Sequence, residues 1–239
     1  MIINHKGEYV SEFEMIAPFG PTIYSAKLNE KDLKFVKHFA ELNRNADHMG
    51  YALSGNIEVQ RGNTAASPEM QLQMLGLLVP HVQEWFKADD ERRPSMMPAH
   101  EDGAIEGLAV NDVDYNSIQF DLGNGVWFNY MKANEFNPAH AHSGMISGII
   151  MVDVPEEIAN EPETIPIESN ARCPGQLEWV HGSWGASAHR IVPVTGQIFM
   201  FPAELKHQVY PFKSDVERLT MSWNVFNVTF DKKVEIDFG

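Results

Sequence analysis

The sequence is poor in cysteine and has no long apolar run. Its 239 residues include one cysteine, Cys173, so the chain cannot form an internal disulfide, and we expect a reducing, cytoplasmic setting. A transmembrane helix needs about 18 or more consecutive apolar residues, and no such run occurs. We therefore expect no membrane partner.

Basic residues are also scarce. Lys and Arg number 18 against 33 Asp and Glu, which gives a formal net charge of -15. Proteins that bind nucleic acids gain affinity by neutralising phosphates with Lys and Arg, so nucleic acid is not expected as a partner. The content of hydrophobic residues, 44%, is high enough for a buried core, so a disordered chain is excluded.

Helical signals dominate the first part of the chain. Asn29 precedes an acidic turn and a run with helical spacing, and Pro68 follows a serine cap and opens a second apolar stripe. Pro80 should kink or end that second helix. The polar stretch 88–104 reads as a surface loop. We expect residues 1–104 to form a strand and helical segment that packs on the core.

Short strands dominate residues 105–239. Apolar alternation at 118–122 and 126–131, separated by Gly123-Asn124-Gly125, predicts a hairpin. The acidic, proline-containing stretch 153–168 reads as a long exposed loop. Many short strands with Gly and Pro turns favour a mostly β fold with flanking helices, built as a sandwich or barrel. The remaining predicted strands are 146–154, 176–180, 191–194, 197–201, 208–212 and 218–228.

Three histidines suggest a metal site. On a strand, residues i and i+2 point to the same side, so His140 and His142 could grip one ion. His207 opens another predicted strand and could add a third ligand. Neutral imidazole suits iron, zinc, nickel and copper, so the ligand type alone does not choose the metal.

Arg218 begins a strand with a polar face. Arg218, Thr220, Ser222 and Asn224 alternate with apolar residues and share one side of that strand. An arginine turned into a barrel interior is costly without an anionic partner. Its guanidinium group matches a carboxylate in a bidentate manner, so we predict a carboxylate anchor at Arg218.

The order of these motifs resembles that of iron(II)- and 2-oxoglutarate-dependent oxygenases, in a branch found in bacterial and phage genomes. That superfamily folds as a double-stranded β-helix, a cupin-like jelly-roll. The resemblance covers about residues 115–228 and leaves residues 1–100 unmatched. The motifs that carry it are Trp127-Phe128-Asn129, His140-Ala141-His142, Ser147-Gly148, Phe201-Pro202, His207 and Arg218-Leu219-Thr220 with Asn224.

The resemblance implies that His140 and His207 are iron ligands. His142 occupies the position where most of the superfamily has Asp or Glu, a departure that leaves two alternatives. Either three histidines bind the metal, or a carboxylate such as Glu178 or Asp153 supplies the third ligand. A site of three histidines could also take zinc, nickel or manganese in place of iron.

The resemblance also implies a site for 2-oxoglutarate. Arg218 would bind the distal carboxylate of this cosubstrate, with Thr220 hydrogen-bonded to the same group. Asn129 or Tyr130 could reach it from the preceding strand, but these two point to opposite faces, so at most one does so. The other expected lining residues are Ser147 and Asn224.

The function implied by the resemblance is a dioxygenase of the hydroxylase type. His140, His142, His207 and Arg218 would be its catalytic residues, and a peptide or small molecule would be its substrate. One alternative is a three-histidine metalloenzyme of the cupin type that needs no 2-oxoglutarate. A second is a non-catalytic jelly-roll with a structural or binding role. A homo-oligomer is compatible with each of them.

Overall fold

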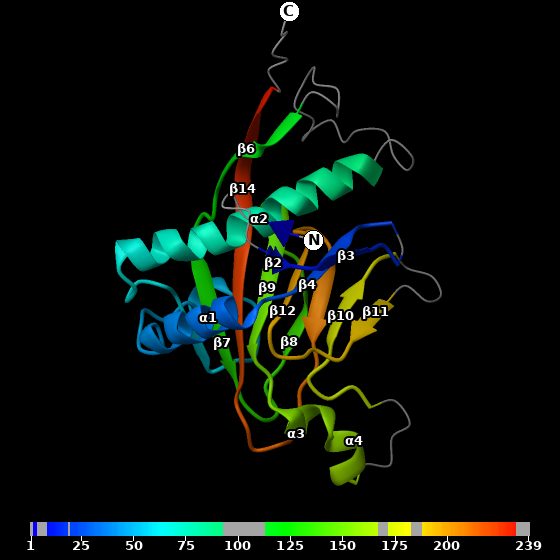
Figure 1. The fold of residues 1–239 in the computed structure, drawn as a ribbon. Helices are drawn as coiled ribbons and strands as arrows, with labels where there is room; N and C mark the ends of the chain where they lie inside the picture. Colours follow the sequence, from blue (N-terminus) through cyan, green and yellow to red (C-terminus); the bar gives the residue numbers. More distant parts are fainter. Residues whose placement is uncertain are drawn as a thin grey trace, which may run out of the picture.

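The computed structural model describes residues 2–3, 9–18, 20–92, 113–166, 172–182 and 188–232. Its centre consists of two antiparallel sheets (Figure 1). Four central strands of the larger sheet lie in the order β12 (Gln197–Pro202), β9 (Ile146–Asp153), β14 (Arg218–Lys232) and β7 (Val126–Met131). The smaller sheet has the order β11 (Ala188–Ile191), β10 (Leu177–Val180), β13 (Lys206–Val209) and β8 (Asn137–His140).

The chain order of these eight strands defines the fold. Successive strands cross from one sheet to the other, apart from the consecutive neighbours β10 and β11. This winding places β7, β9, β12 and β14 in one sheet and β8, β10, β11 and β13 in the other, as in a double-stranded β-helix. The predicted jelly-roll is therefore confirmed.

The N-terminal segment extends both edges of the larger sheet. Strand β4 (Ile23–Lys27) pairs with β12 and with β3 (Phe13–Ile16), and β5 (Val59–Arg61) pairs with β7. A separate pair is formed by β1 (Ile2–Ile3) and β2 (Tyr9–Ser11). The segment thus contributes strands to the core sheet, while the domain boundary at residue 104 stays a prediction.

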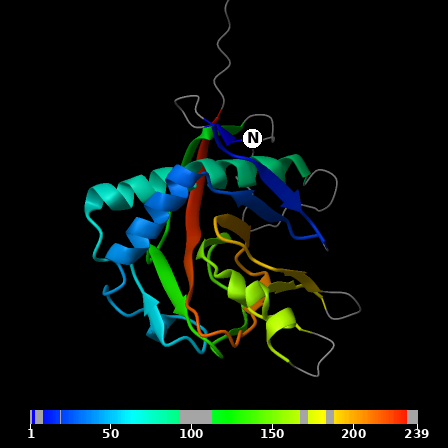
Figure 2. The ribbon, with the colours of Figure 1, turned by 60° about the horizontal axis from the view of Figure 1, so that its bottom comes forward.

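Two helices cover the outer face of the larger sheet (Figures 1 and 2). They are α1 (Glu30–Leu42), where the Asn29 side chain accepts from the Asp32 N–H at 2.9 Å, and α2 (Pro68–Arg92). Their buried side chains pack on Phe128 and Trp223. A second apolar cluster, which includes Trp179 and Phe201, fills the space between the sheets. No helix among the described residues is long and apolar enough to cross a membrane.

The predicted hairpin is wrong. Strand β6 (Val113–Asp121) does not pair with β7; both strands pair with β14. Strand β14 is 15 residues long, so it offers a partner for β7 over its first part and for β6 over its last part. The turn closed by Gly125 N–H and the Leu122 carbonyl, at 2.9 Å, shifts the chain between two strands that run in the same direction.

Two loop predictions also need correction. Helix α2 runs through Pro80 to Arg92, so residues 88–92 are helical, and residues 93–104 of the expected loop lie outside the described residues. The acidic stretch contains α3 (Glu156–Ala159) and α4 (Glu161–Thr164). Glu161 in this stretch is only 4% exposed. Its buried carboxylate is satisfied by hydrogen bonds from the N–H groups of Lys213 and Ser214, at 2.7 Å each. A 3-10 turn, Gly50–Ala52, precedes β5.

Candidate metal and carboxylate site

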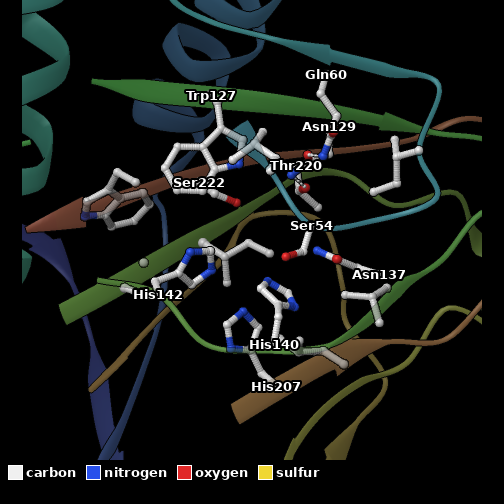
Figure 3. Close-up of a pocket in the computed structure, with 18 of the residues that line it drawn as sticks. Ser54, Gln60, Trp127, Asn129, Asn137, His140, His142, His207, Thr220 and Ser222 are labelled. Carbon is white, nitrogen blue, oxygen red and sulfur yellow. Dashed lines mark hydrogen bonds between the residues drawn. The ribbon is translucent and has the colours of Figure 1, made fainter. Parts of the chain in front are cut away.

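A pocket lies between the two sheets and contains the three predicted histidines (Figure 3). One ring nitrogen each from His140, His142 and His207 lies within 4.8 Å of the others. His140 ends β8 and stands directly opposite His207 on β13, which brings their ring centroids to 4.3 Å. Among the described residues, this is the group of side chains that could hold a metal ion.

His142 reaches the group by a different route from the one predicted. Strand β8 ends at His140, so His142 lies in the following loop and not on the strand. Its backbone N–H donates to the carbonyl of Ala203 at 2.8 Å, which ties this loop to the turn after β12. Its ring lies 4.9 Å from the ring of His140 and 5.1 Å from that of His207. His140 and His142 therefore lie close together because of the loop conformation, and not because they share one face of a strand.

Backbone carbonyls orient two of the rings. Nδ1 of His140 lies 2.7 Å from the carbonyl of Pro138, and Nδ1 of His207 lies 3.1 Å from that of Leu205. A carbonyl oxygen can only accept, so Nδ1 carries the proton in both rings and Nε2 keeps its lone pair. Fixing the tautomer in this way is how proteins present imidazole to metals.

The histidines are neutral at pH 7. Burial, with a smaller effect of the neighbouring imidazoles, lowers the pKa of His142 to about 4 and that of His207 to about 3. Burial also lowers the pKa of His140. Neutral imidazole is the form that binds metals, so all three side chains are ready as ligands.

Neither carboxylate considered as a third ligand joins the group. Glu178 pairs across the sheet with Gln208, whereas its neighbour Trp179 pairs with His207, so Glu178 faces away from the pocket. Its carboxylate accepts from Arg190 Nη2 at 2.6 Å. Asp153 accepts from Lys37 Nζ at 2.8 Å on the surface. The geometry favours the three-histidine alternative.

Arg218 also lies in this pocket, and its charged guanidinium group has few hydrogen-bond partners within the described ranges. It is 2% exposed, and burial lowers its pKa to about 10. Its Nη1 donates to the carbonyl of Gly175 at 2.7 Å, while its Nε is buried with no hydrogen-bond partner among the described residues. A buried donor without an acceptor is costly, so a carboxylate bound here would satisfy it.

Further polar residues surround Arg218. Thr220 and Asn129 are buried and line the pocket, and Asn129 Nδ2 donates to Thr220 Oγ1 at 3.3 Å. Ser147 also lines it, with its hydroxyl donating to Asn224 Oδ1 at 2.7 Å. Asn224 itself is not among the lining residues, so its contact with the pocket runs through Ser147.

The structure does not place Tyr130 in the pocket, which corrects that prediction. Tyr130 alternates with Asn129 on β7 and points to the helix-covered face. Its hydroxyl donates to the Ala40 carbonyl at 2.7 Å, and the Arg44 guanidinium lies over its ring. Tyr130 is therefore a core residue of the helix layer.

The lining residues that were not predicted from the sequence include three with polar side chains. Ser54, Gln60 and Asn137 lie in the pocket (Figure 3), and two of them come from the N-terminal segment. Asn137 lies close to the histidine motif in the sequence, and this proximity could have indicated its position near the site. Gln60 and Ser54 lie more than 60 residues before β7 and carried none.

The fold and the pocket together define a jelly-roll protein with a candidate three-histidine centre. Residues 125–224 match a family model described as "Putative 2OG-Fe(II) oxygenase", and this stretch includes the three histidines and Arg218. The match covers less than half of the chain, and over that segment the chain is similar to the 2OG-Fe(II) oxygenases, a family named for its iron(II) and 2-oxoglutarate. No match was found among curated proteins.

Solved structures show distant likeness. A Pseudomonas putida prolyl-4-hydroxylase is 15% identical, with 94% of each chain covered and a TM-score of 0.42. HygX from Streptomyces hygroscopicus, with nickel, 2-oxoglutarate and hygromycin B bound, is 11% identical, with 95% of this chain and 88% of that chain covered and a TM-score of 0.43. A Burkholderia pseudomallei oxidoreductase of the 2OG-Fe(II) oxygenase family is 13% identical, with a TM-score of 0.31; 46% of this chain and 45% of that chain are covered. These TM-scores are below 0.5, so nothing about activity is taken from them.

Proposed function

We propose that this protein is an iron(II)- and 2-oxoglutarate-dependent oxygenase that hydroxylates a C–H bond of a peptide or small molecule. The observation that supports this most directly is the content of one pocket. It presents three neutral imidazoles together with a buried arginine whose Nε has no hydrogen-bond partner in the described part of the chain. The net charge of -15 disfavours a polyanionic substrate.

The residues present fit the two groups that the superfamily implies. His140, His142 and His207 would hold the metal, and Arg218 with Thr220 would hold the distal carboxylate of 2-oxoglutarate. When bound, the iron supplies oxygen activation, with 2-oxoglutarate converted to succinate and carbon dioxide. The protein's part is to fix imidazole tautomers, to satisfy the cosubstrate carboxylate and to surround both with apolar walls such as Phe201.

One observation favours a second candidate function. The third position of the ligand group is the neutral His142, and no carboxylate of the described residues joins it. A three-histidine jelly-roll enzyme of the cupin type would need no 2-oxoglutarate. Arg218 separates the two candidates, because only the first gives its guanidinium a ligand.

The test is a binding and turnover experiment on protein purified without oxygen and loaded with iron(II). We expect about one metal ion per chain, calorimetric binding of 2-oxoglutarate and succinate formation, with metal lost in a His140→Ala, His207→Ala double variant. Arg218→Met should retain the metal and lose 2-oxoglutarate. Folded, iron-loaded protein that neither binds nor consumes 2-oxoglutarate would rule the proposal out. Metal-dependent activity unaffected by Arg218→Met would favour the second candidate.

A further inference from the structure

We infer that Gln60, on β5 of the N-terminal segment, positions the cosubstrate site by setting the direction of a hydrogen-bond chain. The inference rests on the proposed function and extends it to a residue outside the family-matching segment 125–224. Gln60 is 2% exposed and lines the pocket beside Asn129 and Thr220 (Figure 3).

The three residues form one row across three adjacent strands. Gln60 on β5 pairs with Asn129 on β7, and Asn129 pairs with Thr220 on β14. Side chains of directly paired residues lie on the same face of a sheet, so all three point into the pocket. Gln60 Nε2 donates to Asn129 Oδ1 at 2.9 Å, and Asn129 Nδ2 donates to Thr220 Oγ1 at 3.3 Å.

The direction of this chain decides what Thr220 can offer a ligand. A hydroxyl has one proton and two lone pairs. Because Thr220 Oγ1 accepts from Asn129, its proton remains available to the pocket, where Arg218 would hold a carboxylate that can only accept. In the reverse direction Thr220 would donate to Asn129 Oδ1 and turn lone pairs toward an anion.

Gln60 is the residue that can hold the chain in the favourable direction. The amide of Asn129 has a donor and an acceptor end, and turning it by 180° would reverse the chain. In the structure the NH₂ end of the Gln60 amide faces Asn129 and requires an acceptor there, which keeps the Asn129 NH₂ group on Thr220. Gln60 is thus a positioning residue that acts through Asn129 and Thr220, and it does not itself touch the carboxylate.

A double-mutant cycle on 2-oxoglutarate affinity tests the inference. Gln60→Met removes the donor with little change in length, and Thr220→Val removes the hydroxyl with little change in shape. We expect each variant of the iron-loaded protein to raise the calorimetric Kd for 2-oxoglutarate about fivefold to tenfold, the range for one hydrogen bond. Since Gln60 acts through Thr220, the double variant should bind no more weakly than Thr220→Val alone.

The control is Gln71→Met, which removes another glutamine of the same segment. Gln71 Nε2 donates to the Ala66 carbonyl at 3.1 Å and lies outside the pocket lining. It should lower the melting temperature and leave the Kd for 2-oxoglutarate unchanged. If Gln60→Met does not fold, Gln60→Glu replaces it in the cycle. The carboxylate introduced by Gln60→Glu can only accept a hydrogen bond, so it removes the donor to Asn129. Any direct repulsion between this carboxylate and 2-oxoglutarate would also be present in the Thr220→Val background, which separates it from an effect that acts through Thr220.

The outcomes separate this inference from the proposed function. Wild-type protein that binds 2-oxoglutarate, with the Kd unchanged in Gln60→Met, overturns the role of Gln60 alone. Single effects that multiply in the double variant also overturn it, because they would show independent contributions. Failure of the wild-type protein to bind 2-oxoglutarate removes the proposed function and this inference together.

Discussion

Replacing Arg218 by methionine should leave the ligand-free protein at least as stable as before and abolish its response to 2-oxoglutarate. Arg218 has one described hydrogen bond, from Nη1 to the Gly175 carbonyl at 2.7 Å, and its Nε is buried without a partner. Burial lowers its pKa from the ordinary value of an arginine to about 10. At 1.36 kcal/mol per pKa unit, burial costs the charged form about 3 kcal/mol.

The magnitude for Arg218→Met follows from two opposing effects. Methionine fills much of the same space without a charge, which removes the burial cost of about 3 kcal/mol. It also leaves the Gly175 carbonyl without its donor, which costs about 1–3 kcal/mol. We therefore expect the free energy of unfolding without ligand to lie between that of the wild type and about 2 kcal/mol above it.

Ligand addition should reverse the order of stability. At a 2-oxoglutarate concentration of about 100 Kd, mass action stabilises the wild type by about 2.7 kcal/mol. The Arg218→Met variant should gain almost nothing at that concentration. Urea unfolding of the metal-loaded proteins, followed by circular dichroism with and without 2-oxoglutarate, measures both quantities. A ligand-free variant destabilised by more than about 3 kcal/mol would refute the reasoning, as would an undiminished response to 2-oxoglutarate.

Three further predictions concern other parts of the structure. Burial lowers the pKa of His81 to about 4, whereas its pKa in the unfolded chain is near 6.5. The unfolded chain therefore binds a proton first as the pH falls, and the free energy of unfolding should decrease by about 3 kcal/mol by pH 4. Urea unfolding should show that loss to be smaller in His81→Asn; equal acid losses in both proteins would contradict it. A β-carbon at Gly148 would lie 2.1 Å from the Trp223 ring, so Gly148→Ala should cost about 1–3 kcal/mol, and an unchanged melting temperature would argue against this contact. His142→Asp should favour iron(II) or manganese over zinc in metal competition while weakening 2-oxoglutarate binding, whereas unchanged metal preference would mean that His142 is not a ligand.

The sequence pattern predicted the face of β14 correctly because strand periodicity is local. Side chains alternate with a period of two, so the placement of Arg218 and Thr220 on one face followed from the residue types around them. Thr220 and Arg218 both line the pocket, while Leu219 and Met221 belong to the helix-side core. The same periodicity places Asn129 and Tyr130 on opposite faces of β7, and in the structure Asn129 is the one that lines the pocket.

Features that depend on long-range pairing could not be read in this way. Gln60 lies 69 residues before Asn129, and nothing around it marks β5 as a neighbour of β7. The predicted hairpin failed for the same reason, since the turn at Gly123–Gly125 looks like a reversal until the length of β14 is known. His81, on α2, is fully buried with Nδ1 2.7 Å from the hydroxyl of Tyr24 on β4, a contact between residues 57 positions apart.

The distribution of charge explains why His142 matters to both proposed ligands. The protein has a net charge of -15, yet no Asp or Glu among the described residues lines the pocket, and Arg218 is the single charged lining residue of that part of the chain. A divalent metal held by three neutral imidazoles would bring the pocket to a charge of about +3, which a dicarboxylate of charge about -2 offsets without a protein carboxylate. An aspartate at position 142 would supply one of those negative charges itself. It would strengthen the hold on a hard metal and weaken the attraction for the dianion, so the two affinities should move in opposite directions, a result that simple misfolding cannot produce.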